Sequence, residues 1–280
     1  MDLPDAVGHP AFPTTLESLI RNHGGTVLDV ARESVEREDV MEFEVPEPRI
    51  LAPLLPSSIR AFQAFEGHAQ MAAKRRGGRL TEAWATAPLF SRREHRSVLG
   101  PDEDLAWPAF SEELDFEGQL GCLIGSWGRN LSPGQAADRI FGYVLVNDWV
   151  ARDVERRELE GGVGPGKSRG VACSLGPCVV TADELDPTSV DLTVRVDGDV
   201  WSEGLAADMR WSFVDLLAQA SAGEEVWPGD LLTSGPFAGG CGADVGRLPQ
   251  PGSTVELEGA GLGTLRTRIR ARPRRVPRVS

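Results

Sequence analysis

Two short stretches of the sequence place polar side chains where buried strands are expected. Glu117 and Gln119 are two positions apart in an alternating run, so on a strand both side chains emerge from one face. Asp148 closes a nearly continuous apolar run, and a carboxylate there is costly unless it is paired or ligates a cation. Arg152 follows four residues later and is the expected partner of Asp148. A structural Asp–Arg pair is the alternative to a functional site.

A histidine and two glycine-rich turns are the other candidates. His68 lies in a helix expected over residues 57–76, on the apolar face that also carries Ala61, so it is either a packing residue or an acid/base. Ser234 with its following glycine, and the glycine cluster at 239–242, offer backbone N–H groups suited to an anion, although ordinary turns also explain them. The sequence contains no dinucleotide-binding, P-loop, zincin or serine-hydrolase motif.

The composition limits the classes of protein to be considered. Of 280 residues 41% are hydrophobic, and 42 Asp and Glu against 29 Lys and Arg give a net charge of −13, as in a soluble globular protein. Such an acidic surplus repels phosphate backbones, so no nucleic-acid partner is expected. The sequence shows neither an apolar run of roughly 18 residues nor a secretion signal, so no membrane association is expected. Four cysteines without a CxxC pair favour free thiols and a cytoplasmic location.

The elements that must position the candidate residues are mostly strands. Apolar patterns predict strands at 116–124 and 141–149, a hairpin over 190–201, and a strand after each Pro-Gly turn at 228–229 and 251–252. Helices are few and short, and strands do not alternate regularly with helices. This pattern indicates an α+β fold with a mixed sheet.

An acidic, proline-rich connector divides the chain into a small N-terminal region, residues 1–50, and a main domain, residues 51–270. Capping-box spacing at 14–17 predicts a helix in the N-terminal region, and the run at 26–31 predicts a strand. These elements are expected to form a unit of their own.

Two further segments of the chain have distinct character. Residues 78–108 show no sustained period and are expected to form a long mobile loop or lid. Residues 271–280 belong to a basic tail, which is expected to be a solvated end lying on the acidic surface of the protein; an anion-binding or partner-binding arm is the alternative.

Several segments, read in order, resemble the fumarylacetoacetate hydrolase family. They are FEGH (65–68), LDFEGQL (114–120), IFGYVLVNDWVARD (140–153), SLGPCVVTADEL (174–185), the turn Pro228-Gly229-Asp230 and GAGLGTLR (259–266). The resemblance extends from residue 53 to residue 269 and is most specific at 147–153. It implies a catalytic domain of mixed β-roll or β-sandwich-like architecture, a smaller N-terminal domain, and a homodimer.

The family cleaves or rearranges carbon–carbon bonds in small β-dicarbonyl and 2-oxo acids. The resemblance therefore implies a small-molecule substrate and a divalent ion, Mg²⁺, Mn²⁺ or Ca²⁺, which takes oxygen ligands and stabilises an enolate. Glu117 and Asp148 match metal ligands of the family.

The resemblance also assigns roles to groups around the metal. His68 matches the acid/base, with Glu66 close by to orient it. Arg152 matches an arginine that steadies developing charge. Ser234 falls where the family has a hydroxyl residue that contacts a substrate carboxylate.

Four positions depart from the family pattern. Ala61 stands in place of a metal-ligating aspartate, and Gln119 in place of the second glutamate of the metal-binding pair. Glu155 replaces a glutamine of the family, and Gln119 and Glu155, like Ser234, are candidate substrate-binding residues. Arg169 occupies the position of the family lysine, with Lys167, two residues earlier, as the alternative bearer of that role.

Losing two carboxylates removes two negative charges from a site whose affinity for a divalent ion depends on ligand charge, so the metal is expected to be weakly bound or absent. Three hypotheses follow. The first is an enzyme that acts on an enolisable β-dicarbonyl or 2-oxo acid by lyase, isomerase or cyclase chemistry, with His68 and Glu66 as acid/base and Arg152, Lys167 and Arg169 holding an anion. The second is a metal-dependent acylpyruvate-type hydrolase. The third is a non-catalytic binding or scaffolding protein.

Overall fold

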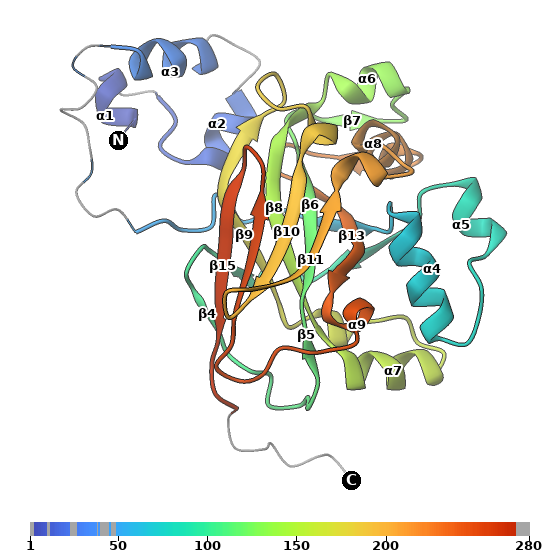
Figure 1. The fold of residues 1–280 in the computed structure, drawn as a ribbon. Coiled ribbons are helices and arrows are strands. Elements are labelled where there is room, and N and C mark those ends of the chain that lie inside the picture. Colours follow the sequence, from blue (N-terminus) through green and yellow to red (C-terminus); the bar gives the residue numbers. More distant parts are fainter. Residues whose placement is uncertain are drawn as a thin grey trace.

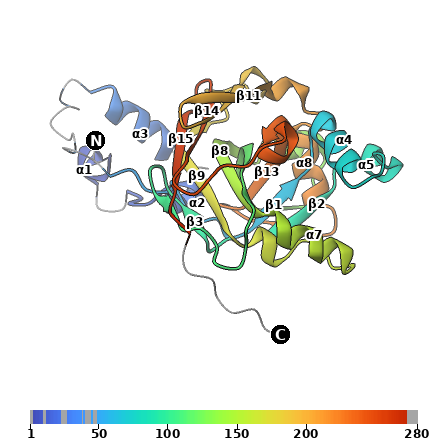
Figure 2. The ribbon, with the colours of Figure 1, turned by 60° about the horizontal axis from the view of Figure 1, so that its bottom comes forward.

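Two curved β-sheets form the centre of the molecule, with short helices around them (Figures 1 and 2). The computed structural model describes residues 3–9, 12–22, 27–37, 39, 45 and 49–272. Helices α4, α5 and α7 lie on one side of the sheets in Figure 1, and α1 and α3 lie on the other. In the described residues no helix is long and apolar enough to cross a membrane.

The larger sheet has eight strands, and its central strands carry the candidate site. Its order is β2 (Phe90–Arg93), β1 (Ile59–Phe62), β13 (Leu231–Cys241), β6 (Glu117–Ile124), β8 (Ile140–Ala151), β9 (Ala172–Thr181) and β3 (Val98–Leu99), with β5 (Leu114–Asp115) paired to β8. Strands β1 and β13 are parallel, whereas β6 is antiparallel to both β13 and β8. The sheet is therefore mixed, as the sequence predicts.

The smaller sheet packs against the larger one. Its order is β11 (Asp199–Leu205), β10 (Asp191–Val196), β14 (Thr254–Gly259), β15 (Gly263–Ile269) and β4 (Asp104–Leu105); β12 (Glu225–Val226) and β7 (Gly128–Arg129) form a separate pair. Leu120 and Leu145 of the larger sheet share one buried core with Val194 and Leu257 of the smaller. Burying each such side chain stabilises the fold by roughly 1.5–3 kcal/mol relative to exposure.

Gly118 explains how the sheets meet beside the site. A Cβ atom at this position would lie 3.1 Å from Leu257 and 3.2 Å from Val194, so a larger residue here would push these two side chains of the smaller sheet away. The side chains before and after it, Glu117 and Gln119, point to the opposite face of β6. The tight packing of one face thus fixes the polar pair on the other.

The helices are short and lie at the ends and edges of the sheets. They are α1 (Leu3–Val7), α2 (Leu16–Asn22), α3 (Val27–Val35), α4 (Glu66–Arg75), α5 (Glu82–Thr86), α6 (Pro133–Ala137), α7 (Arg152–Glu160), α8 (Phe213–Ser221) and α9 (Gly242–Val245), with 3₁₀ turns at Lys167–Arg169, Pro187–Ser189 and Ala206–Asp208. Ile20 of α2 is fully buried against the larger sheet.

Most of the strand predictions are confirmed. The runs at 116–124 and 141–149 form β6 and β8, and the hairpin over 190–201 forms β10 and β11. Strands β13 and β14 follow the two Pro-Gly turns. The helix expected after the capping box at 14–17 is α2.

The helix expected over 57–76 is wrong in its first half. Ala61 lies in strand β1, and helix α4 begins only at Glu66, so Ala61 and His68 do not share a helical face. Strand β1 is hydrogen-bonded between β2 and β13, and these pairings link residues far apart in sequence. The helix-forming composition of the segment cannot reveal such pairings.

Two other segments differ from expectation. The segment expected to be a strand at 26–31 belongs to helix α3. Its apolar residues alternate, which suggests a strand, but they also recur four apart as in a helix, and Ala31 faces inward. Thr26 itself lies outside the described residues. The segment 78–108, expected to be irregular, contains α5 and strands β2, β3 and β4, each of the three paired within a sheet.

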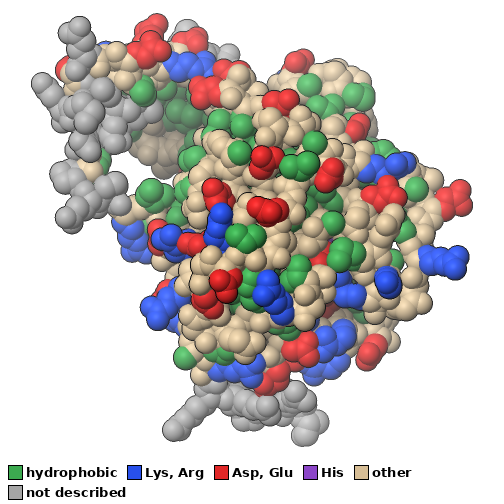
Figure 3. Space-filling view, viewed as in Figure 1, with side chains coloured by type: hydrophobic (Ala, Val, Ile, Leu, Met, Phe, Trp, Pro, Cys, Tyr) green, Lys and Arg blue, Asp and Glu red, His purple; other side chains and the backbone are tan. Residues whose placement is uncertain are grey.

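The basic tail lies partly outside the described residues, from 273 onward. Its described part contacts an acidic residue: Arg272 Nη1 lies 2.5 Å from Glu112 Oε2, and Arg272 Nη2 donates to the backbone carbonyl of Glu112 at 2.6 Å. Just before the tail, Arg270 Nε lies 3.0 Å from Asp104 Oδ2. Figure 3 shows basic and acidic side chains mixed over this lower part of the surface. The described part of the tail therefore lies on an acidic surface of the chain itself.

Candidate active site

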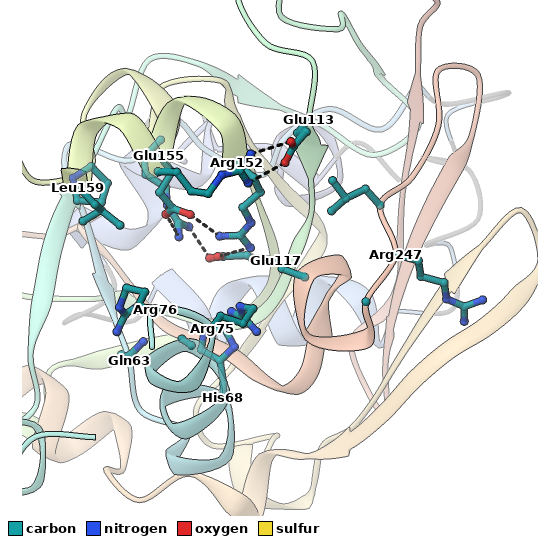
Figure 4. A pocket seen from close by; sticks show the side chains of 17 residues that line it. Gln63, His68, Arg75, Arg76, Glu113, Glu117, Arg152, Glu155, Leu159 and Arg247 are labelled. Carbon is teal, nitrogen blue, oxygen red and sulfur yellow. Dashed lines mark hydrogen bonds and ion pairs between the residues drawn. The ribbon is translucent and has the colours of Figure 1, made fainter. Parts of the chain in front are cut away.

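Arg152 is the centre of a buried charged cluster at the Glu117 end of β6 (Figure 4). Arg152 is the first residue of α7, and its side chain extends toward β5 and β6. Its Nε donates to Asp115 Oδ2 at 2.8 Å, its Nη1 to Glu155 Oε2 at 2.8 Å and its Nη2 to Glu117 Oε1 at 2.9 Å. Each guanidinium nitrogen thus has its own carboxylate, an arrangement that only the planar arginine fork provides.

A second guanidinium completes the cluster. Arg169 Nη1 lies 2.5 Å from Glu117 Oε2 and 3.3 Å from Asp148 Oδ2, while its Nε and Nη2 donate to Glu155 Oε1 at 2.9 and 2.7 Å. Arg93, from strand β2, donates through Nε to Asp148 Oδ2 at 2.9 Å. Three cations and four carboxylates therefore share one network.

The network changes the acidity of its carboxyl groups. Burial acts to raise the pKa of Glu117, but the charges of Arg169 and Arg152 outweigh it and hold that pKa below its usual range. The same balance lowers the pKa of Glu155. For Asp148 burial is the strongest influence and raises the pKa, against the charges of Arg93 and Arg169.

His68 lies beside this network and is held by an aspartate. Its Nδ1 is 2.8 Å from Asp244 Oδ2, and the side chain of Asp244 is fully buried. Arg75 also pairs with Asp244, and the backbone N–H of Gly239 donates to it at 3.1 Å. Burial acts to raise the pKa of Asp244, but its bonds to His68 and Arg75 lower it overall, so the group is a carboxylate at neutral pH.

The glycine cluster at 239–242 does hold an anion, but the anion belongs to the protein. The N–H of Gly242 donates to Asp115 Oδ1 at 2.8 Å, and the N–H of Ala243 donates to Asp115 Oδ2 at 3.1 Å. Asp115 is completely buried. The cluster therefore fixes one of the carboxylates that orient Arg152.

These groups line a cavity of about 570 Å³ between α4, α7 and α9. His68, Arg75, Glu117, Arg152, Glu155 and Arg169 all contribute to its wall. In Figure 4 His68 and Arg75 approach from α4 on one side, and Arg152 and Glu155 approach from α7 on the other. A smaller cavity, of about 260 Å³, continues past His68 to Ala61 and Arg93.

Five residues expected at the site, Glu66, Gln119, Asp148, Lys167 and Ser234, do not line either of these cavities. Glu66 does not contact His68: its carboxylate accepts from Gln70 at 2.9 Å and is half exposed. Lys167 is exposed, with Nζ 4.6 Å above the ring of Phe110. Ser234 is fully buried, and its hydroxyl bonds to backbone groups on both sides.

The partner expected for Asp148 was also wrong. Arg152 contacts Asp115, Glu117 and Glu155 instead, because it starts helix α7 and its side chain extends toward β5 and β6. Arg93, Asp115 and Asp244 are functional candidates that sequence reasoning missed. Asp115 lies within the segment LDFEGQL that carries the family resemblance, and Asp244 follows the glycine cluster, whereas nothing near Arg93 in the sequence marks it.

The residues present do not fit a divalent cation. Gln119 turns its amide nitrogen to Glu117 at 3.3 Å and its oxygen to the N–H of Gly235, so the oxygen is not offered as a ligand. His68, Cys241 and Asp244 place possible ligand atoms within 4.8 Å of one another. However, burial raises the pKa of the Cys241 thiol, which keeps it neutral, and Arg75 and His68 already occupy Asp244.

Comparison with known proteins agrees with this architecture. Residues 57–270 match the family described as fumarylacetoacetate (FAA) hydrolase, C-terminal. The oxaloacetate tautomerase of Bacillus subtilis is 32% identical over 161 residues, which are 57% of this chain and 53% of that protein. The chain thus spans about half the length of the curated relatives it matches.

Solved structures give the same result for the fold. The fumarylacetoacetate hydrolase of the psychrophile Exiguobacterium antarcticum superposes with a TM-score of 0.76 and 25% identity, covering 96% of this chain and 91% of that one. The 2-hydroxyhepta-2,4-diene-1,7-dioate isomerase of Mycobacterium marinum gives a TM-score of 0.65 and 26% identity, covering 80% of this chain and 78% of that one. These named proteins are a hydrolase, an isomerase and a tautomerase, all enzymes.

Proposed function

The chain belongs to the fumarylacetoacetate hydrolase family, and from this premise we propose that it is an enzyme that interconverts the enol and keto forms of a small 2-oxo acid. One observation carries the proposal. The imidazole of His68, oriented by the buried carboxylate of Asp244, lines the same cavity as the guanidinium groups of Arg152 and Arg169. A proton-transfer group and donors for a negative oxygen are the two components that enolisation requires.

His68 has the tautomer needed for a base. The Asp244 carboxylate can only accept a hydrogen bond, so Nδ1 of the imidazole carries the proton. In the neutral ring Nε2 is then the nitrogen with a free lone pair. It can take the proton from the carbon next to the keto group while the oxygen of the resulting enolate gains a proton from solvent, which gives the enol. In the reverse direction the enol oxygen loses its proton and Nε2 returns one to the carbon, which gives the keto form.

The arginines supply donors for the enolate. Each terminal nitrogen of Arg152 carries two hydrogens and donates once to a carboxylate, which leaves one N–H on each for a substrate oxygen. Because the guanidinium is fixed by Asp115 and Glu155, it does not need to reorganise as the charge develops. Such preorganised donors are effective in a site that excludes water.

The substrate class follows from the cavity and from the relatives. Arg75 and Arg76 line the same cavity as Arg152 and Arg169, so an anionic ligand is favoured although the chain is acidic overall. Two of the named relatives act on acids with a second carboxylate, oxaloacetate and a heptadiene dioate. We take a dicarboxylic 2-oxo acid as the first substrate to test.

The test measures loss of the enol absorbance of oxaloacetate in the presence of the purified chain. We expect His68→Ala to lower kcat by about 10²–10⁴-fold, the usual contribution of a positioned acid/base. His95→Ala, which removes a histidine outside these cavities, is the matched control and is expected to retain activity. Undiminished turnover by folded His68→Ala would refute the proposal.

A second assay separates isomerisation from the other hypotheses. Acylpyruvates offered with Mg²⁺ or Mn²⁺ would release a carboxylic acid and pyruvate if the chain were a metal-dependent hydrolase. Cleavage in that assay without oxaloacetate turnover would favour the hydrolase. No turnover of either substrate by folded protein would favour the scaffolding hypothesis.

A further inference from the structure

One nitrogen of Arg169 lies between the two carboxylates at which the sequence resemblance places a divalent ion. Its Nη1 is 2.5 Å from Glu117 Oε2 and 3.3 Å from Asp148 Oδ2. The nearer contact is a charge-assisted hydrogen bond from the guanidinium to the Glu117 carboxylate. A metal ion shared by the same two carboxylates would have to displace this nitrogen.

We infer that the guanidinium group of Arg169, with that of Arg93 beside it, takes the place of the divalent cation, so that the cavity is complete without metal. The inference deepens the proposed function and rests on it for the role of the cavity. The tests of this inference measure metal binding and require no substrate, so the inference and the proposed function can fail separately.

The carboxylate oxygens of the site are already in use. Arg152 occupies Oε1 of Glu117, and Arg169 occupies Oε2. The two arginines also occupy both oxygens of Glu155. A divalent ion needs about six oxygen ligands. It would therefore have to break several charge-assisted bonds to obtain even two or three of them.

Arg93 supplies a second positive charge to Asp148, close to Ala61, which carries no carboxylate. It is located on β2, opposite Ile59 of β1, and its side chain extends to Asp148 through Nε at 2.9 Å. Ala61, where the resemblance expects an aspartate, lines the same small cavity as Arg93. The methyl group of Ala61 offers no ligand, and a guanidinium is the positive charge beside Asp148.

The charges agree with this interpretation. Arg93, Arg152 and Arg169 bring three positive charges to Glu117, Asp148, Asp115 and Glu155. A divalent ion bound between Glu117 and Asp148 would lie within contact distance of fixed guanidinium groups, whose positive charges repel it. Arginine is never deprotonated in proteins, so this built-in cation is permanent and no chelator can remove it.

The first test titrates the purified wild-type chain with Mn²⁺ and follows free ion by electron paramagnetic resonance. We expect no stoichiometric binding at micromolar Mn²⁺, and melting temperatures unchanged by Mg²⁺ or by a chelator. Binding of one Mn²⁺ per chain at micromolar concentration would overturn the inference, whatever the protein does to oxaloacetate.

The second test restores the metal ligands. Gln119→Glu together with Arg169→Met removes the cation and returns a carboxylate, and we expect Mn²⁺ to bind at least about tenfold more tightly than to wild type because ligand charge sets affinity. The matched control replaces Arg92, the neighbour of Arg93 that pairs with Glu224 and has an exposed side chain. We expect Arg92→Met to bind Mn²⁺ no better than wild type.

Circular dichroism and thermal melting show whether the double variant is folded. If it is folded and binds Mn²⁺ no more tightly than wild type, Arg169 does not occupy the cation position and the inference is wrong. If it does not fold, the wild-type titration still decides. Turnover of oxaloacetate by wild type is expected to be unaffected by chelator.

Discussion

Two buried arginine–carboxylate clusters lie at opposite ends of strand β6 and are built differently. Near Ile124, Arg60 Nη1 donates to Asp230 Oδ2 at 2.9 Å, and both side chains are only 4% exposed. The other contacts of this guanidinium include Ser58 Oγ and the backbone carbonyl of Glu225. Near Glu117, in contrast, three guanidinium groups share four carboxylates.

The difference separates a structural pair from a site. Arg60 and Asp230 form one direct hydrogen-bonded ion pair, with Glu224 Oε2 3.6 Å from Arg60 Nη2, and they connect β1 to the turn before β13. In the Glu117 cluster most members have two or three ion-pair partners. Four of its members line the cavity beside His68, namely Glu117, Arg152, Glu155 and Arg169. Isolated buried pairs can often be exchanged for neutral groups without loss. A shared network cannot, because one change removes an ion-pair partner from several buried charges at once.

The largest effect is expected from Arg152→Met. It leaves Asp115, Glu117 and Glu155 without a common partner, so we expect the free energy of unfolding to fall by about 3–5 kcal/mol. Urea unfolding measures this change. Arg156→Met is the control, since Arg156 pairs on the surface with Glu113 and is expected to contribute about 1 kcal/mol or less. Equal losses in both variants would contradict the network.

The next prediction compares how much unfolding free energy a second substitution restores in each of the two clusters. Arg60→Met alone is expected to cost about 3 kcal/mol, and adding Asp230→Asn to recover most of it, because Asn still accepts from the N–H of Trp227. Adding Asp115→Asn to Arg152→Met is expected to recover little, since Glu117 and Glu155 each still lack one of their two guanidinium partners. Unfolding of these four variants and of wild type measures both recoveries, and similar recovery in each cluster would remove the distinction. Activity is expected to survive only in the Arg60 series.

Asp244→Asn tests which acid orients His68. We expect kcat to fall by about 10²-fold or more, because an amide no longer fixes the productive tautomer of the imidazole. The pH profile of kcat is expected to change with it. Glu66→Gln is the control, and we expect activity within about twofold of wild type because Glu66 contacts Gln70 on the surface. A larger loss in Glu66→Gln than in Asp244→Asn would restore the assignment made from the sequence.

Residues positioned by local pattern were predictable from the sequence. Alternation places Glu117 and Gln119 on one face of β6, and the apolar run places Asp148 in β8. The family resemblance located His68 and Arg152, and both line the cavity. It also left a choice between Lys167 and Arg169, and the structure places Arg169 at Glu117.

Residues that depend on distant pairing were not predictable. Asp244 contacts His68 across 176 positions of the chain, and Arg93 contacts Asp148 across 55. Ala61 was assigned to a helix because nothing local shows that β1 pairs with β13. The homodimer, the cytoplasmic location and the boundary near residue 50 stay predictions.

The smallest predicted effect is the loss at low pH of the stability that Asp244 contributes. The pKa of Asp244 is lowered in the folded chain, so the unfolded chain binds this proton more readily. The stability that the carboxylate contributes is therefore fully present above the unfolded value of about 3.9 and is lost as the pH falls through the folded value. Urea unfolding of wild type and Asp244→Asn at matched pH isolates this group, because every other carboxyl group is common to both. We expect their difference in unfolding free energy to be constant above about pH 5 and to shrink below about pH 4. A difference that grew on acidification would mean that Asp244 is held as the neutral acid, and could not fix the proton on Nδ1 of His68.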